Sequence, residues 1–411
     1  RDTDRSRGLG DVYKRQLFYN HLKSENIAED HIIKFAFDTA QDLLKIGENP
    51  IILDNEKEDR KVDPSKFLKW LMPQINGDEM YYLLLDEVQK LGAFESVLNG
   101  FLRNSNVDVY VTGNNSRFLS KDILTEFEGR GDEVHILPLS FSEYYAFIQG
   151  DKSEAYDDYS VYGGLPAVAL MTTEEQKITY LISQMKNVYL RDIILRYSVQ
   201  DEAALGEVMD VIASGISTLT NPRKIASTMN SVHGTTTCDT TVDKYIGYAE
   251  EAFILTRVKR YNVKGRKYIG TPYKIYFEDI GLRNARLAFR QIEGTHIMEN
   301  IIYNELRFRG YQVDVGTVES RERDAGGKEV RIQREIDFIA TLGSKKYYIQ
   351  SAYAIPDKEK YEQETMSFER TTDSFKKIII VEKSMKPRYD ENGYLMMGVK
   401  EFLLDANSLL V

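Results

Sequence analysis

Near-continuous apolar segments alternate with amphipathic patterns between Leu17 and Gly150, and this alternation limits the fold more than any other feature. Strand patterns occur at residues 32–39 (IIKFAFDT), 80–88 (MYYLLLDEV) and 107–113 (VDVYVTG). Helical patterns occur at residues 17–27, 64–75 and 93–105. Strands that are apolar along their whole length are buried on both faces, as in parallel sheets covered by helices. We therefore expect an α/β unit that ends near residue 150.

Composition narrows the class of protein further. The 411 residues, 42% hydrophobic and 29% charged, are enough for two to four globular domains. A net charge of −10 argues against a protein coated in nucleic acid, although it leaves room for a local basic patch. Because the single cysteine, Cys238, cannot form an internal disulfide, we expect a cytoplasmic protein. No apolar run approaches the ~20 residues of a membrane span.

The most informative stretch is YYLLLDEVQ, in which a buried strand ends in Asp86 and Glu87. The carboxyl edge of a parallel sheet is where such folds bind ligands. In nucleotide hydrolases the first acid holds Mg²⁺ and the second orients or deprotonates the attacking water. The alternative is a strand that ends in two solvated acids, which is common in proteins.

Two later segments could complete such a site. The next strand ends in Thr112, Gly113, Asn114 and Asn115, which could reach a γ-phosphate or hold the attacking water, or form an ordinary polar turn. Arg130 stands between glycines, before a strand expected at residues 134–139 (VHILPL). An arginine on such a loop could neutralise charge on a transferred phosphoryl group, or simply lie at the surface.

In this order, the segments LLLDEVQ, VTGNNS and GRGDEVHILPLSFSEY resemble those of bacterial AAA-type P-loop ATPases with a C-terminal domain of unknown function. The resemblance continues through YGGLPAVAL, YIGYAEEAFIL, IYFEDIGLRN and REIDFIA, so it covers nearly the whole chain from about residue 16. It implies ATP and Mg²⁺ as cofactors, with Asp86 and Glu87 as the Walker B pair. It also implies Asn114 or Asn115 as sensor 1. Arg130 would be the arginine finger, which requires a homo-oligomer if it acts from a neighbouring subunit.

The family's phosphate-binding loop, G-x-x-x-x-G-K-[ST], is expected within residues 5–13, but RSRGLGDVYKRQ stands at this place. Asp11 would bring negative charge to the phosphates, and Lys14 is followed by Arg15 instead of a hydroxyl residue. Three explanations compete: the loop was lost, the loop is of an unusual kind, or residues 1–16 are foreign to a truncated sequence. The absent initiator Met and the change of character at Leu17 favour truncation. We expect this chain not to bind ATP properly, although its parent would.

The C-terminal part divides by pattern into three further segments. Residues 151–200 are expected to form a helical lid, and residues 201–270 a winged helix with two helices and a hairpin. The second helix carries acids and few bases, whereas the hairpin carries basic residues that could contact DNA within residues 257–267. They are Arg257, Lys259, Arg260, Lys264, Arg266 and Lys267. Protein packing is the other interpretation of this segment.

Residues 271–411 resemble the α/β core of restriction endonucleases, with Glu299 on a helix and Asp337 on a strand. The third element of that site, Glu-x-Lys, is replaced by Gln350, Ser351 and Ala352. Since Gln is a poor Mg²⁺ ligand and Ala cannot transfer protons, we expect an inactive nuclease-like domain. Simple surface acids are the alternative interpretation of Glu299 and Asp337.

The sequence thus predicts an α/β protein with a P-loop NTPase-type core at residues 17–150, which hydrolyses ATP with Mg²⁺ in the intact parent. The alternative is a non-catalytic regulator that binds DNA or protein and uses the ATPase core as a scaffold. A Mg²⁺-dependent nuclease is a third interpretation, and it predicts DNA nicking that requires Asp337.

Overall fold

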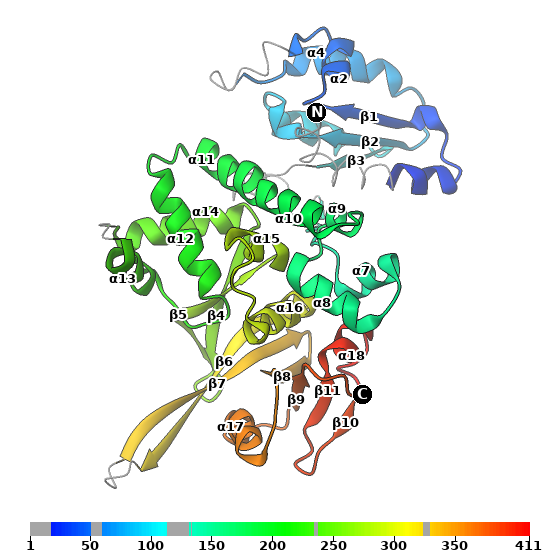
Figure 1. Ribbon diagram of the computed structural model, residues 1–411. Coiled ribbons are helices and arrows are strands. Elements are labelled where there is room, and N and C mark those ends of the chain that lie inside the picture. Colours follow the sequence, from blue (N-terminus) through cyan, green and yellow to red (C-terminus); the bar gives the residue numbers. More distant parts are fainter. Residues whose placement is uncertain (1–17, 51–59, 113–130, 133, 234–236, 324–328) are drawn as a thin grey trace. The chain divides into compact units, whose positions relative to one another are not determined.

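The computed structural model describes residues 18–50, 60–112, 131–132, 134–233, 237–323 and 329–411 (Figure 1). The chain divides into two compact units, residues 1–135 and 136–411. Each unit has its own hydrophobic core and its own sheet.

The first unit contains the expected parallel sheet, in the order β1-β2-β3. The strands are β1 (Ile32–Ala36), β2 (Tyr81–Asp86) and β3 (Val107–Val111). Because β2 is central, it is hydrogen-bonded on both sides, and Leu83, Leu84 and Leu85 are almost completely buried. All three carboxyl ends meet at one edge of the sheet, which confirms the predicted parallel arrangement.

Helices cover both faces of this sheet. The helices are α2 (Ala40–Lys45), α4 (Pro64–Leu71) and α5 (Phe94–Phe101), with 3₁₀ turns at η1 (Glu29–His31), η2 (Met72–Gln74) and η3 (Val88–Lys90). Residues 18–24 are also helical. Leu83 and Leu85 pack on one face against Phe67 of α4, whereas Leu84 packs on the other face against Leu22. Helices on both faces explain why the strands are apolar throughout.

The strand expected at residues 134–139 is not formed, so this prediction was wrong. Val134 is 77% and Ile136 is 51% exposed, and neither belongs to a strand. A strand requires a neighbouring ladder, and the described residues offer none at this segment. Leu139 N–H instead donates to the carbonyl of Gly164, 2.8 Å away, in the second unit.

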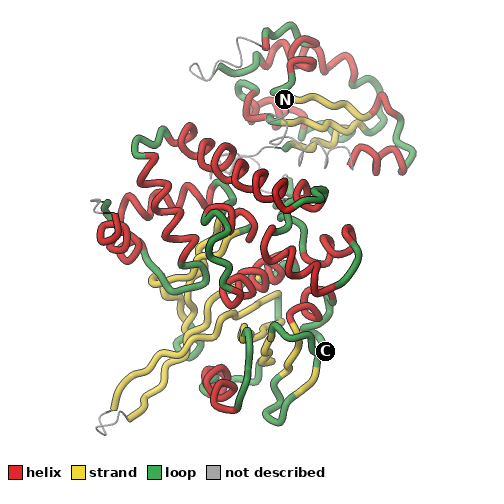
Figure 2. Tube along the Cα trace, in the orientation of Figure 1, coloured by secondary structure: helices red, strands yellow, loops and turns green. Residues whose placement is uncertain are grey.

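The second unit begins with a helical region (Figure 2). Its first helices are α7 (Phe141–Ile148), α8 (Lys152–Tyr162), α9 (Pro166–Ala169) and α10 (Glu174–Ser183). A π-helical stretch, η5 (Gln184–Leu190), joins α10 to α11 (Arg191–Tyr197). Then follow α12 (Glu202–Ser214), α13 (Pro222–His233) and α14 (Asp239–Glu251). Helices therefore account for the region expected to be a helical lid and for the first part of the expected winged helix.

An eight-stranded mixed sheet follows, in the order β10-β11-β9-β8-β7-β6-β4-β5. The strands are β4 (Leu255–Asn262), β5 (Lys267–Phe277), β6 (Gln312–Arg323), β7 (Glu329–Leu342), β8 (Lys345–Ala352), β9 (Lys376–Val381), β10 (Arg388–Tyr389) and β11 (Leu395–Gly398). The helices between and after them are α15 (Ile280–Arg286), α16 (Gly294–Phe308), α17 (Lys358–Glu369) and α18 (Val399–Leu404). Strands β6 and β7 extend together beyond their neighbours as a long arm (Figure 1).

A different hydrophobic cluster lies on each face of this sheet. Ile301 of α16 belongs to the same cluster as Phe338 of β7, whereas Phe368 of α17 belongs to the cluster that contains Ile336 and Ile339. Helices α16 and α17 therefore lie on opposite faces of the sheet.

A buried carboxylate joins α15 to the turn after α8. Asp279 caps α15 by accepting from Leu282 N–H, and it also accepts from Gly164 N–H at 2.8 Å. Burial raises the pKa of Asp279 to about 6, although these hydrogen bonds act to lower it. The close approach needs glycine, because a Cβ on Gly281 would lie 2.0 Å from the carbonyl oxygen of Tyr162.

Gly281→Ala is therefore expected to destabilise the second unit. The new Cβ would clash with the backbone of Tyr162, which cannot move aside easily. We therefore expect the free energy of unfolding to fall by about 1–3 kcal/mol and the Tm to fall by several degrees. Gly247→Ala on α14 is the matched control, since a Cβ there meets nothing within 4 Å. Thermal unfolding followed by far-UV circular dichroism measures both. Equal Tm values for the two variants would contradict the proposed close contact.

Candidate functional site at the carboxyl edge of the parallel sheet

The candidate site lies where β2 ends. Asp86 is the last residue of β2 and is only 4% exposed. Phe37 N–H, just after β1, donates to the Asp86 carbonyl at 3.0 Å, so the ends of the two strands are fixed together. The apolar run of β2 thus carries a carboxylate to the buried edge of the sheet.

Thr112 lies beside Asp86, as expected for adjacent strand ends. Its N–H donates to the carbonyl of Leu85 at 2.9 Å, and its hydroxyl group donates to Asp86 Oδ1. This hydrogen bond helps to orient the Asp86 carboxylate. Of the other residues predicted for this site, Asn114, Asn115 and Arg130 lie outside the described residues.

Glu87 has an unusual backbone and an unusual acidity. It adopts the left-handed conformation (φ 51°, ψ 40°), which is uncommon for a residue other than glycine. The pKa of Glu87 is raised to about 7: burial is the largest cause and the charges of Asp38 and Asp86 act in the same direction, whereas Lys90 and a hydrogen bond from Gln89 lower it. Gln89 Nε2 donates to Glu87 Oε2 at 2.5 Å. A carboxylate with a pKa near 7 has the proton affinity of a general base.

Asp38 is a member of this edge that the sequence interpretation missed. It stands two residues after the end of β1 and is exposed, and its charge contributes to the raised pKa of Glu87. The signal was present in the sequence, since Asp38 is an acid close to the end of a buried apolar run, as Asp86 is. The edge therefore presents carboxylates from the ends of two strands.

Oxygen donors of this kind suit Mg²⁺, which usually binds one or two carboxylates together with water and phosphate oxygens. Within the described ranges, no group of three or more His, Cys, Asp or Glu side chains is arranged as a complete metal site. The edge is thus suited to a metal shared with a phosphate ligand rather than to an all-protein cage.

In the second unit, the residues predicted for a nuclease site are only partly brought together. Glu299 on α16 and Asp337 on β7 both contact Lys274. Gln350 instead donates to Glu364 of α17 at 3.1 Å, and Ala352 belongs to the hydrophobic cluster on the α17 face. The β8 residues at the place of Glu-x-Lys therefore do not complete a site with Glu299.

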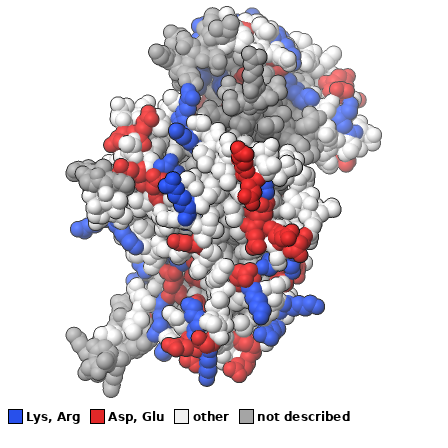
Figure 3. All heavy atoms as spheres, viewed as in Figure 1, with Lys and Arg blue, Asp and Glu red and all other residues white. Residues whose placement is uncertain are grey.

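Two of the six basic residues of the β4–β5 hairpin are engaged within the protein. Arg257 pairs with Glu250 and Asp243, and Arg260 is buried and donates to the carbonyls of Thr271 and Pro272. The exposed members of the set are Lys259, Lys264, Arg266 and Lys267. On the face of the second unit drawn in Figure 3, basic and acidic side chains form small separate groups, without a continuous basic surface.

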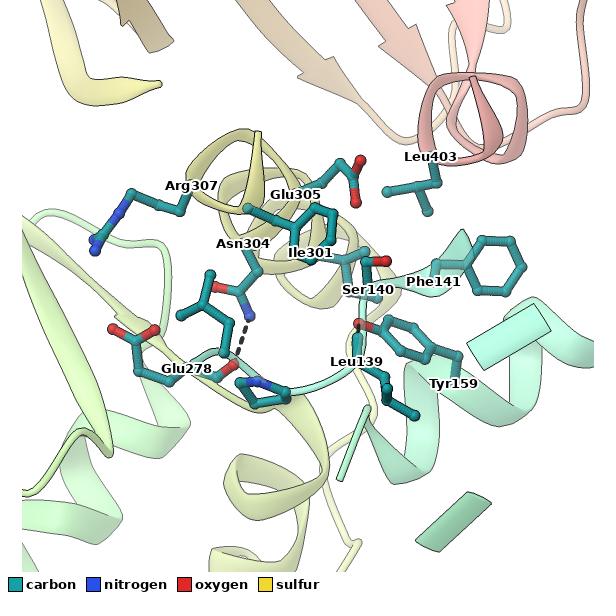
Figure 4. Close-up of a pocket in the computed structure, with 13 residues that line it drawn as sticks. Leu139, Ser140, Phe141, Tyr159, Glu278, Ile301, Asn304, Glu305, Arg307 and Leu403 are labelled. Carbon is teal, nitrogen blue, oxygen red and sulfur yellow. Dashed lines mark hydrogen bonds between the residues drawn. The ribbon is translucent and has the colours of Figure 1, made fainter. Parts of the chain in front are cut away.

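A small cavity lies where residues 137–141 cross α16 (Figure 4). Tyr159 OH donates to the carbonyl of Leu139 at 2.8 Å, and Asn304 Nδ2 donates to that of Glu278 at 3.0 Å. Its volume of about 20 Å³ has room for one water molecule, so it is no ligand site. No helix among the residues that the structure describes is long and apolar enough to cross a membrane.

Comparisons with known proteins identify two family domains in the chain. The family described as "AAA domain" matches residues 15–145, and a domain of unknown function (DUF8612) matches residues 153–293. An uncharacterized protein of Haemophilus influenzae is 30% identical over 392 residues, which cover 94% of this chain and 90% of that protein. The chain belongs to this family of AAA-domain proteins. Its AAA unit, residues 1–135, is accordingly ATPase-like.

More distant relatives add little. An uncharacterized protein of Methanocaldococcus jannaschii is 22% identical over 417 residues, covering 97% of this chain and 84% of that protein. A crystal structure of a Vibrio cholerae protein covers 92% of this chain and 90% of its own at 13% identity. Its TM-score of 0.22 is too low to indicate a common fold.

Glu87→Gln is expected to stabilise the AAA unit above pH 7 but not near pH 4.5. Between the ordinary glutamate pKa of 4.5 and the raised pKa of about 7, the folded state keeps a proton that the unfolded state has lost. The free energy of unfolding therefore falls as the pH rises from 4.5 to about 7. Trp70, the chain's single tryptophan, lies on α4, so its fluorescence follows the melting of this unit.

We expect the variant to melt a few degrees above the wild type at pH 8. The exposed Glu25→Gln change in the same unit is the control and should reproduce the wild-type pH dependence. A Glu87→Gln difference that does not change with pH would contradict a raised pKa.

Proposed function

We propose that the AAA unit of this family binds and hydrolyses ATP with Mg²⁺ at the carboxyl edge of β1-β2-β3. The observation that carries this proposal is Asp86, buried at the end of the central strand, oriented by Thr112 and followed by a Glu87 whose pKa lies near 7. The match to the AAA domain family supports the same ligand class.

The roles of the residues follow from their places. Asp86 would hold Mg²⁺, which supplies charge neutralisation of the phosphates when bound. Thr112 fixes the direction of the Asp86 carboxylate and lies close enough to that edge to contact a terminal phosphate. Glu87 would accept a proton from the attacking water. Asn114 or Asn115 would position that water, and Arg130 would stabilise the developing charge, from a neighbouring subunit in a homo-oligomer.

A non-catalytic regulator with the AAA unit as scaffold is the second candidate. In the second unit, α12, α13 and α14 are followed by the β4–β5 hairpin, and Thr220 between α12 and α13 pairs with Tyr273 of β5. This order supports the proposal of a winged helix. We propose that it contacts protein or, through Lys259, Arg266 and Lys267, DNA.

The remaining segments keep the assignments that the sequence suggested. We propose that residues 151–200 serve as the lid of the ATPase, and that residues 271–411 form an inactive nuclease-like domain. The element order α16-β6-β7-β8-α17-β9 supports the latter, because a helix, three strands, a helix and a strand form the core of restriction-endonuclease-like folds.

A loop-containing version of the protein separates the two candidates. Residues 1–16 are replaced by an apolar strand followed by G-x-x-x-x-G-K-[ST], and turnover of Mg²⁺-ATP is compared with that of the same protein carrying Glu87→Gln. Loss of a general base should lower turnover roughly 100-fold or more while binding of a fluorescent ATP analogue is retained. Glu25→Gln is the matched control.

Equal turnover in the Glu87→Gln and control proteins would contradict the ATPase proposal. Binding of the analogue without any turnover would favour the scaffold. For the chain as printed, we expect no saturable binding of the analogue.

A further inference from the structure

The ammonium group of Lys274, on β5, is held between three carboxylates. Its Nζ lies 2.6 Å from Glu335 Oε1, 2.8 Å from Glu299 Oε1 and 3.2 Å from Asp337 Oδ1. The Lys274 side chain is only 3% exposed. Because an ammonium group has three N–H donors, these oxygens satisfy all of them.

The cluster joins strands that are not neighbours in the sheet. Strand β5 is separated from β7 by β4 and β6. The register shifts between β4 and β5 at Val258/Arg260, and between β6 and β7 at Asp314/Gly316. Such irregularities bend and twist strands, which helps to bring β7 within reach of a lysine side chain on β5.

The second irregularity also determines which way Asp337 faces. Val315 of β6 stands opposite two residues of β7, Asp337 and Phe338, and this is the pattern of a β-bulge. Phe338 belongs to the hydrophobic cluster on the α16 face, whereas Ile336 and Ile339 belong to the one on the α17 face. Asp337 contacts Lys274 and therefore shares the α16 face with Glu299.

Helix α16 is fastened to β5 at the same place. Asn300 accepts from Phe277 N–H and donates to Phe277 O, both at 2.8 Å, as a neighbouring strand would. Tyr276 OH donates to Glu299 Oε1 at 2.7 Å, and Ser351 N–H donates to Asp337 Oδ2 at 2.9 Å. The carboxylates are thus held by several groups besides Lys274.

The charges favour a permanently protonated lysine. Burial lowers the pKa of Lys274, but the charges of Glu299, Asp337 and Glu335 overcome this and raise it well above the ordinary value. Burial also raises the pKa of Glu299 to about 7. A protonated, buried lysine can be neither a general base nor a nucleophile at neutral pH.

We propose that Lys274 is the resident cation of this cluster, at the place where a nuclease of this fold would hold a divalent metal, and that it fastens β5 to α16 and β7. The cluster then binds no Mg²⁺ or Mn²⁺ and cleaves no nucleic acid. This inference is independent of the function proposed for the AAA unit.

Mn²⁺ binding to the full chain tests the first part. Free Mn²⁺ is measured by electron paramagnetic resonance during titration of the wild type and of Asp337→Asn, and plasmid nicking is assayed with both. We expect identical binding curves and no nicking. A Mn²⁺ site or a nicking activity that Asp337→Asn removes would overturn the proposal.

Lys274→Ala tests the second part. Removing one partner of a buried ion-pair cluster leaves unpaired charges, so we expect the Tm of the second unit to fall by about 10 °C. Mn²⁺ should raise the Tm of this variant, because the vacated carboxylates can hold a cation, and should leave that of the wild type unchanged. Lys259→Ala, an exposed change on β4, is the matched control and should melt like the wild type.

If Lys274→Ala does not fold, the combination of Lys274→Ala with Glu299→Gln and Asp337→Asn decides the matter. Removing the excess negative charge should restore folding and a measurable transition. Trp70 fluorescence in the AAA unit should be unchanged in every variant. A Lys274→Ala protein that melts like Lys259→Ala, or a combined variant that remains unfolded, would overturn the proposal.

Discussion

The three ion pairs of Lys274 bring together parts of the second unit that are distant in the sequence. Glu299 is 25 residues from Lys274, and Asp337 is 63 residues from it. Without the lysine, buried carboxylates of α16 and β7 would face one another at high cost, because a charge taken out of water must be paired. The bend of the sheet, the bulge at Asp337 and the docking of α16 on β5 are all consistent with this one requirement.

The AAA unit also has carboxylates at a buried sheet edge, but it balances them differently. Lys90 lowers the pKa of Glu87 without offsetting the effects of burial, Asp38 and Asp86, so the pKa stays near 7. In the second unit, Lys274 neutralises the carboxylates. At the edge of the parallel sheet, a cation that binds together with a ligand would neutralise Asp86 and Glu87. That contrast favours a Mg²⁺-nucleotide at the first edge and a structural role at the second.

Strands with continuous apolar patterns could be predicted from the sequence, whereas side-chain contacts that depend on the tertiary structure could not. Strands β1, β2 and β3 and the places of Asp86 and Thr112 follow from buried runs that end in polar residues. The prediction of a strand at residues 134–139 was wrong, because an apolar run in the sequence does not reveal whether a neighbouring strand is there to pair with it. The alternation in REIDFIA conceals the bulge that turns Asp337 toward α16. Lys274 was not singled out, because nothing in the sequence indicates its three partners.

The most direct test is anomalous diffraction from crystals of the loop-containing version of this protein, grown with Mn²⁺ and a non-hydrolysable ATP analogue. It reports both acidic sites in one measurement. We predict a Mn²⁺ peak beside Asp86 and none between Glu299, Glu335 and Asp337, where Lys274 should retain its place. A peak within the Lys274 cluster, with none at the edge of the parallel sheet, would contradict the assignment of both sites.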